Sequence, residues 1–113
     1  MVKFLKLDAT ASQDLTSGAL SFTTSWTKPV RIQEIILHAS VAITEDVTIT
    51  RDSVNGANYD AIIRKRSLSS EQDFVFRPDG ELDLQGGDNL KVQCTNANTT
   101  GIVYLTIKAR ELN

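Results

Sequence analysis

The chain has 113 residues, a length suited to a single domain that can bury a core without disulfides or a metal. Its hydrophobic content of 41% and charged content of 23% are ordinary for a globular protein and argue against disorder. A formal net charge of −2 argues against nucleic acid as a partner, and aromatic residues, at 6%, are fewer than a sugar-binding or base-stacking surface usually needs.

Residues 1–14 are expected to form an N-terminal arm or edge strand followed by a loop. Val2–Leu7 predicts a short strand or extended arm, and the small polar residues of Ala9–Gly18 predict a loop. Lys3 and Lys6 interrupt the apolar residues, so no signal peptide is expected, and no run of about 18 apolar residues predicts a membrane span. We therefore expect a soluble protein that is not exported by a signal peptide, and the single cysteine, which excludes an internal disulfide, fits assembly in a reducing cytoplasm.

Residues 15–113 are expected to form the folded domain. Ala19–Trp26 alternates between apolar and polar residues, which predicts a strand. Val30–Ile43 is the longest apolar stretch, and its spacing also fits a helix. Its many β-branched residues, and the lack of an N-cap residue after Pro29, favour a strand. The adjacent pair Ile35-Ile36 breaks the alternation and predicts either a bulge or a strand buried on both faces.

Further strands are predicted wherever apolar residues recur at a period of two, because one face of such a strand meets a core. Turn residues separate them, for example Asn55-Gly56 and the segment Arg77–Glu81. The residues that mark these strands are Val47 and Ile49; Tyr59–Leu68; Phe74 and Phe76; Leu82 and Leu84; Leu90, Val92 and Cys94; and Ile102, Tyr104 and Thr106.

About eight short strands at near-regular spacing predict an all-β fold, a single antiparallel, jelly-roll-like β-sandwich with no helix longer than one or two turns. Cys94 falls on one of the apolar faces, which predicts a buried and inert thiol. The residues expected to be mostly buried are Leu20, Phe22, Ile36, Val47, Ile49, Phe74, Phe76, Leu90, Val92 and Leu105.

No catalytic, cofactor-binding or metal-binding residues are predicted, so we expect neither an enzyme nor a bound cofactor. His38 is the single histidine, and four strand residues place Glu34 about 13 Å away from it. We interpret His38 as a partly buried or interface residue. No G-x-S-x-G segment offers a nucleophile on a shaped turn.

Two groups of oxygen-bearing turn residues are interpreted as solvated faces. Their spacing does not match the helix–loop calcium motif. The first group is Asp79, Glu81, Asp83 and Asp88, and the second is Asp52, Asn55, Asn58 and Asp60.

Arg64-Lys65-Arg66 is the sharpest basic feature of the sequence. In a strand, Arg64 and Arg66 share one face and Lys65 lies on the other, which favours an edge strand guarded by charge. One interpretation is protection of that edge against aggregation. The second is a docking strip for an acidic partner protein, and nucleic acid is a weaker third alternative.

Four segments carry a family resemblance: SGALSFTTSW, GANYD, DFVFRPDGELDL and GGDNLKVQCTNANTTGIVYLTIKAREL. Together with the expected lack of a signal peptide, they resemble small β-sandwich structural proteins of tailed-bacteriophage virions, with the nearest likeness to capsid decoration, or cement, proteins. The resemblance covers most of the chain from Ser17 onward.

The resemblance implies a virion structural protein that binds the outer surface of an assembled head at junctions between capsid subunits. The implied partner is the major capsid protein, the implied state is a homo-oligomer (a homodimer or homotrimer), and the implied location is the capsid surface, after assembly in the bacterial host cytoplasm. Neither nucleic acid nor a membrane is an implied partner.

Protein-interaction residues are predicted from the chain itself, because the family is too varied to transfer contact residues. An unpaired N-terminal strand can add to the sheet edge of a neighbour, and the basic triplet can contact an acidic surface. The predicted residues are Val2, Phe4, Leu5, Leu7, Arg64, Lys65 and Arg66.

Two other functions remain open at this point. A tail-fibre module that binds a receptor or carbohydrate would need exposed aromatic residues, and Trp26, Tyr59 and Tyr104 are all expected on strands rather than at loop tips. A head-to-tail connector or another tail component is also structural, and the sequence does not separate it from a cement protein.

Overall fold

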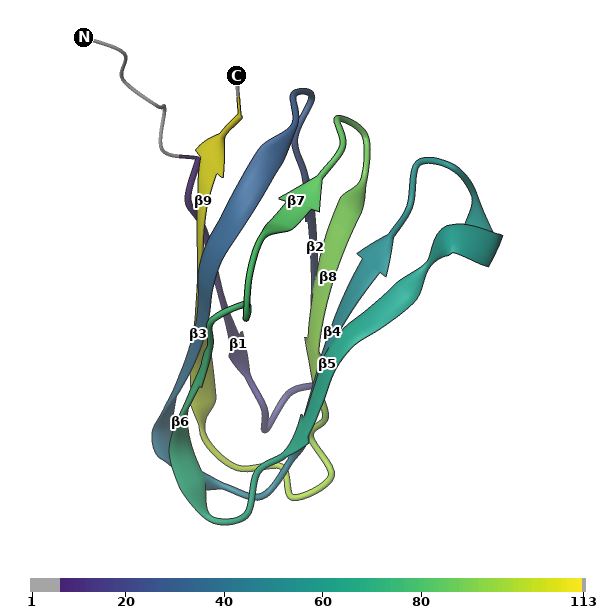
Figure 1. Ribbon diagram of the computed structural model, residues 1–113. Coiled ribbons are helices and arrows are strands. Elements are labelled where there is room, and N and C mark those ends of the chain that lie inside the picture. Colours follow the sequence, from purple (N-terminus) through teal and green to yellow (C-terminus); the bar gives the residue numbers. More distant parts are fainter. Residues whose placement is uncertain (1–6, 113) are drawn as a thin grey trace, which may run out of the picture.

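The structure is a computed structural model that describes residues 7–112. These residues form nine strands and one short 3₁₀ helix, arranged as two packed antiparallel sheets (Figure 1). The expected all-β sandwich is confirmed, and the longest helix among the described residues has three residues. The elements are β1 (Ala9–Asp14), β2 (Leu20–Ser25), β3 (Val30–Ile43), β4 (Asp46–Asp52), η1 (Ala57–Tyr59), β5 (Ala61–Ser67), β6 (Glu71–Phe76), β7 (Leu82–Leu84), β8 (Asn89–Cys94) and β9 (Ile102–Glu111).

Strand pairing follows one long hairpin that is wound into two layers. β4 pairs with β5 at the hairpin tip, and behind it β3 pairs with β6, β2 with β8 and β1 with β9. Winding then places β9 beside β3 and β8 beside β4, which gives the sheets β1-β9-β3-β6 and β2-β8-β4-β5. This nested arrangement of eight strands is a jelly roll. The short β7 pairs with β3 next to the segment that β6 occupies.

The core lies between the two sheets, where alternate residues of each strand point inward. Seven of the ten expected core residues are buried, which confirms them, whereas Phe22, Ile36 and Phe76 are only partly buried. The confirmed residues are Leu20, Val47, Ile49, Phe74, Leu90, Val92 and Leu105.

The stretch Val30–Ile43 forms the single long strand β3, as β-branched content and Pro29 indicate. Its pairing register shifts between Ile32 and Glu34, and again between His38 and Ile43, so the expected irregularity is present on both sides of the Ile35-Ile36 pair. With these shifts, β3 pairs with β9 along one edge and with both β6 and β7 along the other edge.

Two expectations about the strands β1 and β9 are wrong. Ala9–Gly18 is not a loop throughout, because Ala9–Asp14 is β1, an edge strand that takes its ladder hydrogen bonds from β9. The inward face of β9 is not the one that contains Tyr104, whose side chain is 47% exposed, because Val103 and Leu105 occupy the core. Apolar residues occur on both faces of this strand, and the pairing with β3 decides which face is buried.

A buried carboxylate fixes the loop between β8 and β9. Glu45 is 3% exposed and accepts hydrogen bonds from the Thr95 hydroxyl at 2.7 Å and from the backbone N–H groups of Ala97 at 2.9 Å and Asn98 at 2.8 Å. Three donors around one carboxylate compensate for its burial, since a buried charge without such partners is costly.

Candidate protein-interaction surfaces

The chain enters the sandwich at Leu7, which is held from two sides. Its N–H donates to the carbonyl of Ala109 at 2.9 Å, and its carbonyl accepts from the indole N–H of Trp26 at 3.2 Å. Lys28 and Glu111 form an ion pair at 3.1 Å beside it, and these side chains line a shallow hollow of about 210 Å³. The other predicted arm residues, Val2, Phe4 and Leu5, lie outside the described residues.

The basic triplet lies on β5, which is an edge strand of its sheet, as its charges predict. Arg64 and Arg66 pair with the buried Ile49 and Val47 of β4, so both arginines lie on the side of the strand that faces the other sheet. Lys65 points to the outer face. The three charges therefore do not form one strip, because two of them are directed toward the space between the sheets.

Arg66 links the edges of the two sheets. Its guanidinium forms an ion pair with Glu71 at the start of β6, at 2.9 Å, and lies 5.9 Å from the centre of the Phe74 ring. β5 and β6 therefore face each other across one side of the sandwich, as Figure 1 shows.

The structure does not bring Leu7 and the basic triplet together. Leu7 precedes β1, the edge strand of the first sheet that lies opposite to β6, whereas Arg64 and Arg66 lie on the β5–β6 side. Leu7 and the two arginines are therefore on opposite sides of the sandwich.

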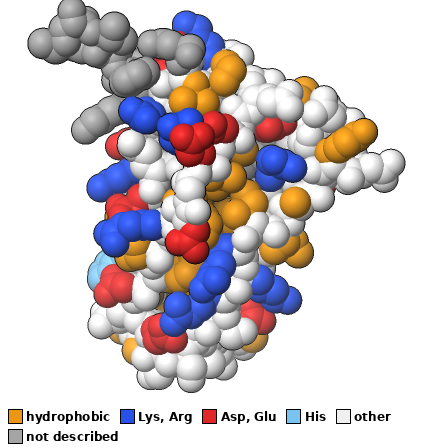
Figure 2. Space-filling view, in the orientation of Figure 1, with side chains coloured by type: hydrophobic (Ala, Val, Ile, Leu, Met, Phe, Trp, Pro, Cys, Tyr) orange, Lys and Arg blue, Asp and Glu red, His pale blue; other side chains and the backbone are white. Residues whose placement is uncertain are grey.

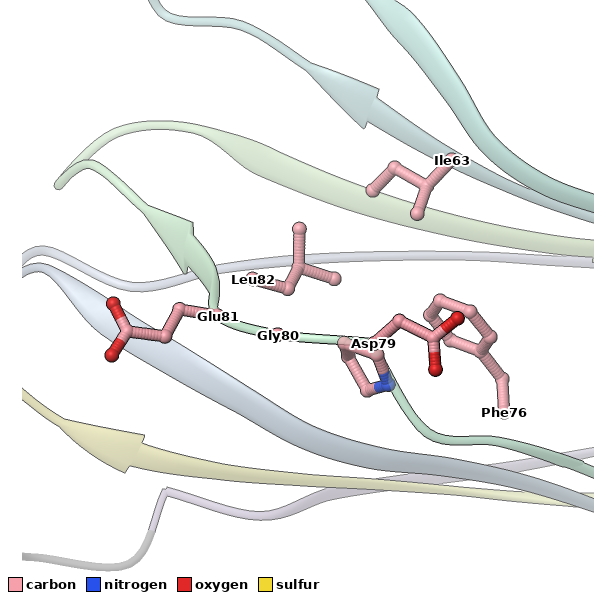
Figure 3. Close-up of a pocket in the computed structure, with 7 residues that line it drawn as sticks. Ile63, Phe76, Asp79, Gly80, Glu81 and Leu82 are labelled. Atoms are coloured by element: carbon pink, nitrogen blue, oxygen red, sulfur yellow. The ribbon is translucent and has the colours of Figure 1, made fainter.

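A groove that sequence reasoning missed runs between β5 and the segment from β6 to β7. Ile63 of β5 and Leu82 of β7 point toward each other across it, with the Phe76 ring at one end (Figure 3). These partly buried side chains line a hollow of about 230 Å³, and hydrophobic surface bordered by charged side chains is visible there in Figure 2. Ile63 occupies a bulge between the pairs Ile49–Arg64 and Thr50–Ile62, which the sequence does not mark.

His38 is exposed and not partly buried, and it contacts a carboxylate that the sequence separates from it by 35 residues. Its Nδ1 lies 2.6 Å from an Asp73 oxygen, and its ring stacks on Tyr104 with 6.5 Å between ring centres. β6 and β9 flank β3 at this position, which is why the three side chains meet on the outer face. Whether His38 is an interface residue stays a prediction.

The four residues of the first acidic group, Asp79, Glu81, Asp83 and Asp88, have different surroundings in the structure. Arg31 forms ion pairs with Asp83 at 2.7 Å and with Glu81 at 3.1 Å, and its hydrogen bond lowers the pKa of the Asp83 carboxyl below its usual value. In Figure 3 the Glu81 carboxylate points away from the groove, whereas Asp79 lies beside Phe76 at its rim.

Asp88 was expected to be solvated, and this is wrong, because only 3% of it is exposed. It closes two turns by accepting hydrogen bonds from the N–H groups of Val54 at 2.8 Å and Gln85 at 3.0 Å. In the second group, Asp60 is exposed and accepts the Ser53 N–H at 2.7 Å. Within residues 7–112, no three His, Cys, Asp or Glu side chains are grouped so as to hold a metal ion.

The aromatic residues are not all on strands. Tyr59 belongs to η1, in the connection between β4 and β5, and 61% of it is exposed, so the expectation of a strand position is wrong. Trp26 directly follows β2 and is half-buried against Leu7, and Tyr104 lies on β9 as expected.

No protein-family model matches the chain, and no curated protein matches it by sequence. Among solved structures, it is similar to PirA with a TM-score of 0.50 and 11% identity over 90% of each chain. It also aligns with the Drosophila NLP-core (TM-score 0.46, 16% identity, 91% of this chain and 97% of that one) and with the infectious bursal disease virus Gx strain structure (TM-score 0.31, 11% identity, 96% and 36%). At 11% identity the likeness to PirA concerns the fold alone, and the two lower scores carry no argument. Among the described residues, no helix is long and apolar enough to cross a membrane.

Proposed function

We propose that this protein is a non-enzymatic structural protein of a tailed-bacteriophage virion, which binds the outer surface of the capsid and stabilises it as a decoration, or cement, protein. Its partner is the major capsid protein, it acts as a homodimer or homotrimer, and it joins the virion after synthesis in the bacterial cytoplasm. The family resemblance of the sequence and the jelly-roll fold support this proposal.

The observation that carries the proposal is the separation of the two predicted contact regions. Leu7, the one predicted contact residue of the arm that the structure describes, precedes β1, and the arginines lie on the opposite side, along β5. A rigid sandwich with contacts on two sides can bridge neighbouring subunits, which is the task of a cement protein at a subunit junction. Weak single contacts suffice, because the second contact of a bound molecule forms at a high effective concentration.

The arm supplies the first contact by strand addition. Its residues Val2, Phe4 and Leu5 are apolar and are interrupted by Lys3 and Lys6. An extended segment of this kind pairs with a free sheet edge, where backbone hydrogen bonds give affinity and alternate side chains give register.

The test is deletion of residues 1–6, which keeps Leu7 and its hydrogen bonds to Trp26 and Ala109 in place. We expect the shortened protein to fold and to bind emptied capsids at least about tenfold more weakly than the full chain. A matched variant, in which residues 1–6 are replaced by six Gly and Ser residues, should be equally weak if apolar side chains matter. Unchanged capsid affinity and oligomeric state in the deletion variant would rule out a docking role for the arm.

Copy number separates a cement protein from a tail component. Quantitative mass spectrometry of purified virions should find hundreds of copies per particle if the protein covers capsid junctions. A handful of copies would instead indicate a connector, a tail component or a fibre.

Exposed Tyr59 favours a receptor- or carbohydrate-binding module as the second candidate function. A tyrosine ring at a protruding connection can stack on a sugar face, and η1 presents it at 61% exposure. Binding to host-cell polysaccharide that is lost in Tyr59→Ala, together with a low copy number, would support this alternative over the cement role.

A further inference from the structure

We propose that the outer face of the sheet β1-β9-β3-β6 binds a neutral sugar in a hollow beside Tyr104. This site does not depend on the cement proposal. It also differs from the alternative based on Tyr59, because the ring that it uses lies on β9 and not on η1.

The hollow lies over β1 and β9 and has a volume of about 490 Å³. Four of the side chains at its six lining positions lie on the outer face of the sheet, and all four carry a hydroxyl group. The volume falls within the range of roughly 300–1,000 Å³ that is usual for small-molecule sites. The lining residues are Thr10, Ala11, Ser12, Tyr104, Leu105 and Thr106.

Tyr104 directs one face of its ring into this hollow. His38 of β3 stacks on the ring, with 6.5 Å between ring centres and 26° between ring planes, and its Nδ1 lies 2.6 Å from a carboxylate oxygen of Asp73. β9 lies between β3 and β1, so His38 covers the ring from the β3 side, whereas the hollow lies on the β1 side. The uncovered face can therefore stack on the apolar face of a sugar ring.

Hydroxyl groups supply the polar contacts of the site. Within residues 7–112, the hydroxyls of Thr10, Ser12 and Thr106 have no hydrogen-bond partner in another side chain or in the backbone. A hydroxyl group both donates and accepts hydrogen bonds, as the hydroxyls of a sugar do. A ligand with many hydroxyls can therefore satisfy these groups whichever way each of them is turned.

The charges around the hollow favour a neutral ligand. None of the six lining residues is charged. Beyond one end lie Asp8, which accepts a backbone N–H at 3.2 Å, and Lys108, which pairs with Glu34 at 3.5 Å. Beyond the other end, Asp14 accepts the N–H and the hydroxyl of Thr16 at 3.0 and 2.7 Å. Each of these charges is engaged within the chain, so neither an anionic nor a cationic ligand gains a partner here.

The test is a titration of ¹⁵N-labelled full-length protein with the methyl glycosides of glucose, galactose, mannose and N-acetylglucosamine. Two control ligands are sorbitol, which has hydroxyls but no apolar ring face, and methyl glucuronide, which adds a carboxylate. We expect at least one neutral glycoside to shift the amide signals of Ser12, Tyr104 and Thr106 with a dissociation constant below about 20 mM. Both controls should bind at least about fivefold more weakly. Capsids are not involved, so failure here is distinguishable from failure of the cement proposal.

A matched pair of tyrosine variants locates the binding. Tyr104→Ala should weaken it at least about fivefold, whereas Tyr59→Ala, which removes the other exposed tyrosine, should leave it unchanged. Thr106→Val keeps the shape of the side chain and removes one hydroxyl, so it should also weaken binding, and it replaces Tyr104→Ala if that variant does not fold.

Three results would overturn the proposal. The first is that none of the neutral glycosides shifts these signals at about 100 mM. The second is that sorbitol or methyl glucuronide binds as well as the neutral glycosides. The third is that Tyr59→Ala abolishes binding while Tyr104→Ala retains it, which would assign the sugar to η1.

Discussion

At the scale of single residues, the buried carboxylates lie in connections between strands. Glu45 lies between β3 and β4, and Asp88 directly precedes β8. The sequence did not indicate the burial of Glu45, because its donors Thr95, Ala97 and Asn98 lie about fifty positions away. A carboxylate buried in a turn therefore depends on a set of donors that only the fold reveals.

Glu45→Ala should lower the free energy of unfolding by about 3 kcal/mol, because it leaves buried donors of the β8–β9 loop without an acceptor. Urea denaturation monitored by circular dichroism measures the loss. The control is Glu81→Ala, whose side chain is 68% exposed and should leave the stability nearly unchanged. Equal losses in the two variants would contradict a structural role for Glu45.

Cys94 is buried, as expected, and burial raises the pKa of its thiol to about 11, with Glu45 and Asp46 adding in the same direction. The reactive thiolate is therefore scarce at pH 8. Labelling by a disulfide reagent at this pH should be at least about 100-fold slower in the native protein than in guanidinium chloride. A native rate within a few fold of the denatured one would show that the thiol is accessible.

At the scale of elements, the sequence predicts strands well where one face is strongly apolar. β2 and β8 follow from alternation, and β3 follows from its β-branched content and Pro29, whereas β1 was missed because its inward residues are only Ala9, Ala11 and Gln13. Small polar residues form a strand here because β9 supplies a template for pairing. The strand propensity of the residues therefore does not predict a strand that is stabilised mainly by pairing with its neighbour.

β6 carries two phenylalanines on one face, and the structure separates their roles. Phe74 is 3% exposed and Phe76 is partly buried at the groove. Phe74→Ala should cost about 3–5 kcal/mol of folding free energy, and Phe76→Ala about 1–2 kcal/mol. Chemical denaturation of both single variants checks this difference, and a Phe76→Ala loss as large as that of Phe74→Ala would place Phe76 in the core.

One of the interpretations of the charges on β5 is that they guard an edge that would otherwise be free to pair with another chain. Replacing Arg64, Lys65 and Arg66 together by threonine should cause concentration-dependent self-association, measured by sedimentation velocity. Lys91→Thr with Lys108→Thr removes charge from the interior strands β8 and β9 and should leave the sedimentation unchanged. If the β5 variant sediments like the wild type, the edge needs no protection.

At the scale of the whole molecule, the jelly-roll class could be predicted, but the order of strands could not. The nested pairing joins residues as distant as Ala9 and Ile107, and nothing local in either strand specifies that partner. The same limit applies to the candidate site. The edge position of Arg64 was predicted, whereas the groove needed Ile63, Phe76 and Leu82 to be brought together from three strands.

Pairing between the first and last described strands should make folding slow. Most contacts join distant parts of the chain, and their loop-closure entropy has to be lost before they form. Stopped-flow refolding followed by Trp26 fluorescence should give a time constant of roughly 0.01–1 s. Refolding in microseconds would contradict a transition state that requires these pairings.

The ladder between β1 and β9 also gives the molecule two distinct ends. The start of β1 and the end of β9 lie at one end of the sandwich, and the end of β1 and the start of β9 lie at the other (Figure 1). On a capsid held through the arm, the turn after Asp14 would project into the medium. A foreign epitope grafted between the exposed Thr16 and Ser17 would then be displayed to antibodies, whereas a fusion after Leu112 would be pressed against the shell. The direction of one edge strand thus decides which terminus or turn suits the protein as a display scaffold.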